Sequence, residues 1–337
     1  DDIVRRMLEL VERRHGDQQL IVILDEAGQY AASREERVGD LQGLAQNFKA
    51  IGKGRAWIIA TAQQTLTDTV DPINATRLFK LKDRFPVSIE LKADDIKVIT
   101  YKRLLSKTQG ARETLAALYE EHGSKLNIRT ELEKAKGYPT AVDKEGFIQL
   151  YPFLPQHFDL MMNIISRLAK STGGTGLRSA IKVVQETLIG AFNGEPFASQ
   201  PVGRLVTIVD FFDVLRQDME SAPAFKHTVR AVEKSEQRYG RDSAETRVAK
   251  AVAVMQVLDD FPLNRHNLAA LLVSAVDEAS NEEEINAAVD TLRDDQSVPL
   301  EEIEGRLWFL SDRSAELQRE WRDIQPGSND ERQVLAD

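Results

Sequence analysis

The chain of 337 residues contains no cysteine, which excludes disulfide bonds, a cysteine nucleophile and thiolate metal sites. Its histidines lie far apart and no two stand four residues apart, so a histidine metal site is not expected. No apolar run approaches the ~18–20 residues that a membrane-spanning helix needs. We therefore expect no contact with a membrane, and the lack of cysteine fits the reducing cytoplasm.

Acidic residues outnumber basic ones. The chain has 44 Lys and Arg against 54 Asp and Glu, which gives a formal net charge of −10. Strong non-specific binding of nucleic acid by the whole surface is therefore not expected, although a local basic face remains compatible with the sequence. The composition is otherwise ordinary for a globular protein, and the length predicts two or three domains.

The most informative segment that is present is the apolar run Leu20–Leu24, which is followed by Asp25 and Glu26. Five apolar residues in succession predict a parallel strand buried on both faces in an α/β sheet. Two charges at the end of such a strand are costly unless a cation or a reacting group uses them. The pattern is that of the Walker B motif of P-loop ATPases, in which Asp25 holds Mg²⁺ through water and Glu26, the general base, polarises the attacking water. The alternative is a buried strand that surfaces at an acidic turn.

A second apolar strand is predicted at 56–61, after an amphipathic helix at about 41–51. Strand, helix and strand, with both strands apolar throughout, predict a parallel sheet with a right-handed crossover. In ATPases of this class the strand beside Walker B ends in a polar residue, sensor 1, which touches the attacking water or the γ-phosphate. Gln63 or Thr61 fits this role, and the alternative is an ordinary polar strand end.

A complete phosphate-binding loop is missing from the sequence. The Walker A motif needs Gly-Lys followed by Ser or Thr, and the only Gly-Lys pair, Gly52-Lys53, is followed by Gly54. We expect a fragment that begins downstream of its own P-loop, and the alternative is a degenerate ATPase that has lost catalysis.

Two arginines complete the predicted ATP site. Arg84 precedes an alternating segment, 86–91, that is predicted to be a strand, and AAA+ proteins often place there a finger that reaches the ATP of a neighbouring subunit. A finger of this kind implies an oligomer, and a surface salt bridge is the alternative. Arg178 follows the glycines of 173–176 at the start of a predicted helix, which matches sensor 2 of an AAA+ lid.

The C-terminal part of the sequence is predicted to be helical with one hairpin. Helices are predicted at 244–258, 263–276 and 285–292, and segment 298–310 predicts a hairpin that turns at Glu304-Gly305. Three helices followed by a hairpin are the pattern of a winged helix. Because acidic residues crowd this region, we favour a protein-interaction or intramolecular role over the reading of DNA.

On these residues the chain resembles the large P-loop ATPases of bacterial BREX phage-defence systems, the BrxC/PglY kind. The resemblance covers nearly the whole chain and is carried by LIVILDEAGQY at 20–30, DLQGLAQNFKAIGKGRAWIIATAQQT at 40–65, LKDRFP at 81–86, YPFLPQHFD at 151–159 and FLSDRSAELQREW at 309–321. It implies an AAA+ module, a lid and a winged-helix-like region within a much longer protein whose P-loop lies upstream.

The expected fold class is α/β: a partial AAA+ P-loop NTPase core with a parallel sheet, then a helical lid and a mostly α-helical, winged-helix-like C-terminal region. The expected domains are an ATPase core portion at 1–105, a connector or insertion at 106–150, a lid with sensor 2 at 151–203, and the winged-helix-like domain at 204–337.

The leading hypothesis is an ATP-hydrolysing AAA+ component of BREX defence that uses ATP and Mg²⁺, this fragment alone being inactive. Its catalytic residues are Glu26 and Arg84, and its nucleotide and metal ligands are Asp25, Thr61, Gln63 and Arg178. The resemblance and the finger imply a homo-oligomer that acts with other BREX proteins, such as the methyltransferase, and on DNA directly or through partners. The alternatives are an inactive scaffold and a DNA-remodelling ATPase similar to replication initiators and loaders.

Overall fold

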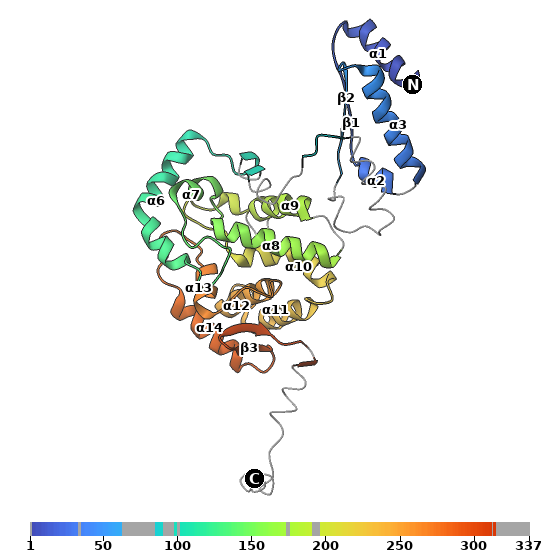
Figure 1. Cartoon of the computed structure of the whole chain (residues 1–337). Coiled ribbons are helices and arrows are strands. Elements are labelled where there is room, and N and C mark those ends of the chain that lie inside the picture. The colour runs from blue at the N-terminus through green and yellow to red at the C-terminus, as the bar shows by residue number, and fades with distance from the viewer. Residues whose placement is uncertain are drawn as a thin grey trace, which may run out of the picture. The chain divides into compact units, whose positions relative to one another are not determined.

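The computed structural model describes residues 2–32, 35–62, 85–89, 98–99, 102–172, 176–190, 196–311 and 313–314. It divides into two compact units, Asp1–Lys92 and Ala93–Asp337, which are described separately below (Figure 1). Within the described ranges no helix is both long and apolar enough to cross a bilayer.

The N-terminal unit is built on a small parallel sheet. In chain order its described elements are α1 (Asp2–His15), β1 (Leu20–Leu24), α2 (Ala27–Ala32), α3 (Glu35–Gly52) and β2 (Ala56–Ala60). The strands pair in parallel from Leu20 opposite Ala56 to Leu24 opposite Ala60, and α2 and α3 form the crossover between them. The predicted strand, helix and strand are therefore confirmed.

The prediction that these strands are buried on both faces is wrong for the described chain. Alternate residues, including Leu24 and Ala60, pack against apolar side chains of α2 and α3. The opposite face of the sheet is open, with Ile21, Ile23, Trp57 and Ile59 exposed by 58%, 67%, 56% and 50%. The reason is that the described contacts of α2 and α3 are with one side of the sheet.

The predicted strand at 86–91 is also not formed where the structure describes it. Residues 85–89 have no regular secondary structure, and Val87 and Ile89 are 79% and 85% exposed. Alternation of apolar residues makes a strand only when a neighbouring strand is in place to pair with it, and the described sheet consists of β1 and β2.

The larger unit is mostly helical. Its described elements are α6 (Gln109–Thr130), α7 (Lys144–Leu150), α8 (Pro155–Thr172), α9 (Gly176–Ile189), the 3₁₀ turn η1 (Phe197–Ser199), α10 (Ile208–Ser221), α11 (Lys226–Tyr239), α12 (Ala244–Met255), α13 (Arg265–Leu271), α14 (Glu282–Asp294), β3 (Leu300–Ile303) and β4 (Arg306–Phe309). The described chain is thus mainly α-helical with a small parallel sheet. The assignment of an AAA+ core stays a prediction, as do the four domain boundaries.

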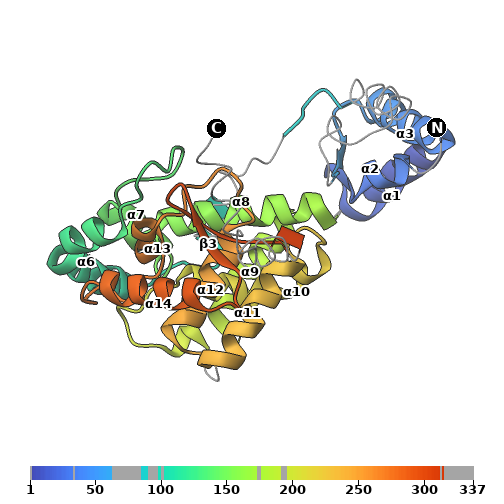
Figure 2. The same ribbon diagram turned by 90° about the horizontal axis from the view of Figure 1, so that it is seen from below.

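Helix α12 lies at the centre of this unit. From Val248 to Met255 every residue is buried, because the helix is apolar on nearly all sides and packs against α10, α11 and α14 (Figure 2). Ser243 caps its N-terminus by accepting a hydrogen bond from the Thr246 backbone N–H at 3.1 Å.

The predicted C-terminal hairpin is present. β3 and β4 pair in antiparallel register, and Glu304 and Gly305 both have positive φ, 52° and 76°, as a tight two-residue turn between twisted strands requires. The Leu307 backbone N–H also donates to the Leu263 carbonyl at 2.9 Å, which ties β4 to the segment between α12 and α13. Three helices and a hairpin occur in the predicted order, and the assignment as a winged helix stays a prediction.

A buried histidine in α8 makes the stability of this unit depend on pH. His157 is fully buried, its Nδ1 lies 3.1 Å from the Val206 carbonyl oxygen, and its Nε2 has no partner among the described atoms. Burial lowers the pKa of His157 from its ordinary value to about 4, because the charged ring would be desolvated. The neutral ring therefore donates through Nδ1.

Acid should consequently destabilise this unit through His157. The unfolded chain takes up the proton near pH 6.5 and the folded chain only near pH 4, so stability falls as the pH drops between these values and falls no further through His157 below them. The shift corresponds to a loss of about 3 kcal/mol. Denaturant unfolding of His157→Asn between pH 7 and pH 4 should show a flatter pH dependence than the wild type. The exposed His15→Asn should leave the slope unchanged, and equal slopes in all three proteins would contradict the prediction.

Candidate functional site

Two segments of the N-terminal unit meet where β1 and β2 end. Asp25 and Glu26 follow β1, and Thr61 follows β2. Because the strands are parallel, their carboxyl ends lie at the same edge, and the Thr61 backbone N–H donates to the Leu24 carbonyl at 3.0 Å. The structure therefore brings together three of the residues that the sequence predicted for the site.

The Thr61 side chain connects both acidic residues. Its hydroxyl donates to Oδ1 of Asp25 at 2.6 Å and accepts from the backbone N–H of Glu26 at 2.9 Å. The first bond is short because the acceptor is a carboxylate. Glu26 has a positive φ of 55°, so the chain turns sharply at the end of β1 and presents its backbone N–H to Thr61. This hydroxyl fixes one oxygen of Asp25 and the turn that carries Glu26.

A glycine allows the two strand ends to approach each other. A Cβ atom on Gly28 would lie 2.8 Å from Cβ of Ala62, closer than real Cβ atoms come. Gly28 is in the first turn of α2, and Ala62 follows Thr61 directly. Any side chain at position 28 would therefore push the turn with Asp25 and Glu26 away from the end of β2.

The carboxylates are more accessible than the sequence argument assumed. Asp25 is exposed and Glu26 is half-buried. The cost of burying two charges at a strand end therefore does not apply here. The evidence for a site is the hydrogen-bonded arrangement with Thr61, which holds an exposed carboxylate in one position.

The other predicted residues cannot be added to this cluster. Gln63 and Arg84 lie outside the described residues. Arg178 lies within α9, which begins at Gly176 as predicted, but its side chain is outside the described part.

The site fits a Mg²⁺ ion that is held mainly by a nucleotide. Among the described residues no group of three or more His, Asp or Glu side chains gathers in a metal-binding arrangement. Mg²⁺ with nucleotides needs only one or two carboxylates, since phosphate oxygens and waters supply the other ligands. The Asp25 hydrogen bond engages one oxygen, so the second oxygen of this exposed carboxylate can accept from a water on such an ion.

Sequence analysis missed a charged cluster in the helical unit. Lys250 and Asp213 have side chains exposed by only 3% and 5%, and Lys250 Nζ lies 2.9 Å from Oδ1 of Asp213. The signal was available, since Lys250 stands within the apolar run of 248–255, where a lysine needs a buried partner.

One known family matches this chain. The family described as the second domain of the BREX system ATPase PglY matches residues 97–276, more than half of the chain. The chain belongs to the BREX PglY ATPase family. The resemblance to BREX ATPases predicted from the sequence is thereby confirmed, and the chain contains a domain of a phage-defence ATPase. No solved structure matches the chain.

The segment that matches the PglY domain begins after the strand-end site. It includes α6 to α13 and the Lys250–Asp213 pair, whereas Asp25, Glu26 and Thr61 precede it. The family assignment therefore rests on the helical unit, and the roles of the three strand-end residues are argued from their geometry.

Proposed function

We propose that Asp25, Glu26 and Thr61 form the metal- and water-activating half of the Mg²⁺-ATP hydrolysis site of a PglY-type ATPase. The observation that supports this most is the hydrogen bond from Thr61 to Asp25 at 2.6 Å, which joins the ends of two neighbouring parallel strands. Membership of an ATPase family supports ATP as the substrate.

In this proposal each residue has one task. Asp25 orients the water shell of the ion through the oxygen that Thr61 leaves available. Glu26, placed by the sharp turn after β1, accepts a proton from the water that attacks the γ-phosphate. Thr61 holds Asp25 and Glu26 in position through its two hydrogen bonds. When bound, Mg²⁺ neutralises charge on the β- and γ-phosphate oxygens.

The phosphate cradle is proposed to come from another part of the same ATPase. The matching family is itself described as a second domain, which supports a parent protein with further domains. Gln63 as sensor 1, Arg178 as sensor 2 and Arg84 as a finger in a homo-oligomer remain parts of the proposal. So do action with other BREX proteins, such as the methyltransferase, and action on DNA.

The test removes the Thr61 hydroxyl in the full-length ATPase. Thr61→Val keeps the shape of the side chain and loses both hydrogen bonds, whereas Thr61→Ser keeps the hydroxyl. A hydrogen bond to a charged group contributes about 1.5–3 kcal/mol, so ATP turnover of Thr61→Val should fall about 10- to 100-fold. Thr61→Ser should stay close to the wild type.

Two results would contradict the proposal. Full turnover in Thr61→Val would show that the threonine bridge does not serve hydrolysis. A wild-type protein that neither binds nor hydrolyses ATP, with DNA and partner proteins added, would favour the inactive scaffold.

A further inference from the structure

A polar pocket lies in the helical unit. Its volume is about 450 Å³, and its walls come from the end of α9, the η1 segment, the start of α10, the turn between α11 and α12, the first turns of α12, and the chain near Ser274. This is the size of a small-molecule site. All its lining residues lie within the segment that matches the PglY family.

The buried acids of the pocket already have partners. Asp213 is neutralised by Lys250 at 2.9 Å. Asp210 accepts hydrogen bonds from the backbone N–H and the hydroxyl of Thr207 at 2.7 and 2.9 Å, and burial raises the pKa of its carboxyl. Asp213 is therefore compensated by a cation, whereas the hydrogen-bond partners of Asp210 are neutral and its charge also acts on Arg204.

Three arginines of the same pocket have no ion pair of this kind within the described part of the chain. There, the Arg204 side chain donates to the Ser274 hydroxyl at 3.4 Å, and that of Arg247 donates to the Leu272 carbonyl at 3.3 Å. No described carboxylate lies within 4 Å of Arg204, Arg241 or Arg247. The third acid in the lining, Asp242, is exposed, as are Arg204 and Arg241, so water screens these three charges, whereas Arg247 is half-buried.

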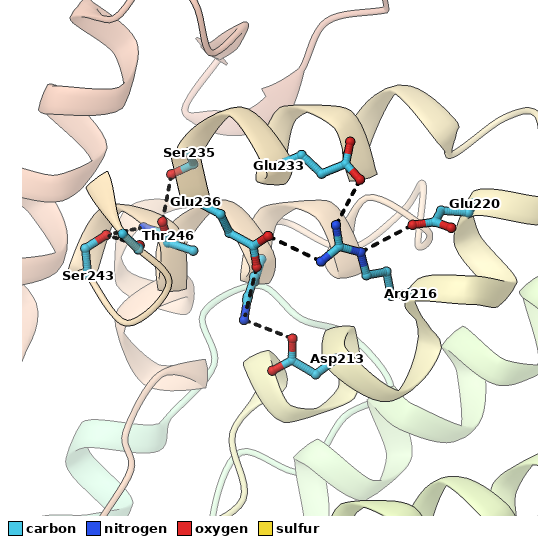
Figure 3. Close-up of polar contacts among 10 residues, drawn as sticks. Asp213, Arg216, Glu220, Glu233, Ser235, Glu236, Ser243 and Thr246 are labelled. Atoms are coloured by element: carbon cyan, nitrogen blue, oxygen red, sulfur yellow. Dashed lines mark hydrogen bonds and ion pairs between the residues drawn. The ribbon is translucent and has the colours of Figure 1, made fainter. Parts of the chain in front are cut away.

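A neighbouring arginine in this unit has its charge compensated by several acids. Figure 3 shows Arg216 between Glu220, Glu233 and Glu236, with nitrogen–oxygen distances of 3.3, 2.9 and 3.3 Å. The helices thus surround this arginine with three glutamates. Among the described residues no pocket arginine has such a set of acids: together with Lys250 the three arginines make four cationic side chains in a lining that contains three aspartates.

Two helix ends add to this positive potential. The pocket is lined by Thr207, the N-cap of α10, and by Asp242, which immediately precedes Ser243, the N-cap of α12. Both helices are long enough to have a positive N-terminal dipole, which favours an anion, although an acid in each first turn, Asp210 in α10 and Glu245 in α12, offsets part of it.

We infer that this pocket binds a phosphate-bearing small molecule through Arg204, Arg241 and Arg247. The planar fork of a guanidinium matches two phosphate oxygens at once. A single carboxylate has two oxygens and can match one guanidinium fork, whereas a diphosphate has enough oxygens for all three. The pocket belongs to the helical unit and the proposed hydrolysis residues to the N-terminal unit, and the inference does not rest on the proposed function.

The test measures binding of inorganic pyrophosphate to the 337-residue chain by titration calorimetry. Arg241→Gln is the cleanest variant, because the Arg241 side chain has no described hydrogen bond that folding would lose. Its dissociation constant should rise at least about tenfold, as should that of Arg247→Gln. Asp242→Asn should bind at most a few-fold more tightly, because it removes one of three carboxylates in the lining and water screens its charge.

Control variants separate this pocket from other causes. Arg167→Gln removes one surface charge that pairs with Asp259 and Asp260, and Asp25→Asn alters the proposed hydrolysis site. Both should bind pyrophosphate as the wild type does. Circular dichroism confirms that each variant is folded.

The inference is overturned if the wild type does not bind pyrophosphate, if Arg167→Gln weakens binding as much as Arg241→Gln, or if binding is lost in Asp25→Asn. It is also overturned if a short single-stranded DNA binds through Arg241 while pyrophosphate and ADP do not, because the pocket would then contact nucleic acid. If ADP competes with pyrophosphate, the ligand is a nucleotide rather than free phosphate, and the inference stands.

Discussion

Replacing Lys250 with methionine should lower the free energy of unfolding of the helical unit by about 3–5 kcal/mol. Methionine has a similar length and apolar character, so the loss will come from charge rather than from a cavity. Removing one partner of a buried ion pair leaves the other as an isolated charge, and this is the expensive case for such pairs. Here Asp213, 5% exposed, would lose its partner at 2.9 Å, and Glu236 would lose a second contact at 3.7 Å.

Chemical denaturation followed by circular dichroism measures this effect. Lys234→Met makes the same change at an exposed position of α11 and should alter stability by less than about 0.5 kcal/mol. The double variant Lys250→Met with Asp213→Leu should recover much of the loss, since an apolar pair can replace a buried ion pair. An equal loss in the single and double variants would show that the methionine itself does not fit.

Replacing Glu26 with glutamine should abolish most ATP hydrolysis by the full-length ATPase while leaving ATP binding intact. Glutamine keeps the size of the side chain and the backbone bond to Thr61, but it cannot accept a proton from the attacking water. Loss of a general base typically lowers the chemical rate by about 10²- to 10⁴-fold. Single-turnover assays of this variant should therefore show a loss of hydrolysis, whereas binding assays should show that its affinity for ATP is unchanged.

Glu36→Gln is the matched control. Glu36 is an exposed residue of α3, and the same substitution there should leave both activities unchanged. If Glu26→Gln hydrolyses ATP at the wild-type rate, Glu26 is not the base. If it loses binding together with hydrolysis, the variant has disturbed the site rather than the chemistry.

The local elements of the N-terminal unit were predictable because they depend on neighbouring residues. Two apolar runs separated by an amphipathic helix predicted β1, α3 and β2 in parallel, and this topology alone places Asp25 and Thr61 at one edge. The burial of β1 was not predictable, because five apolar residues look the same whether one face is covered or both. The strand predicted at 86–91 is not formed at its described residues, 86–89, for a related reason, since alternation does not reveal whether a partner strand exists.

In the helical unit, contacts between residues far apart in the sequence could not be predicted. Lys250 and Asp213 are 37 positions apart, so their pairing appears only once α10 and α12 are packed. The arginine pocket is assembled from segments around positions 204, 241 and 247, and no local motif marks it. By contrast, the hairpin of β3 and β4 was predicted because Glu304-Gly305 is a local turn signal.

The open face of the small sheet has a calorimetric consequence. Ile21, Ile23, Trp57 and Ile59 keep a continuous apolar surface in contact with water. Any polypeptide that comes to cover this surface would release that water, and its association would have a negative change in heat capacity. Because apolar association weakens on cooling, the contact would loosen in the cold. The emission of Trp57 would shift towards the blue as the face is covered.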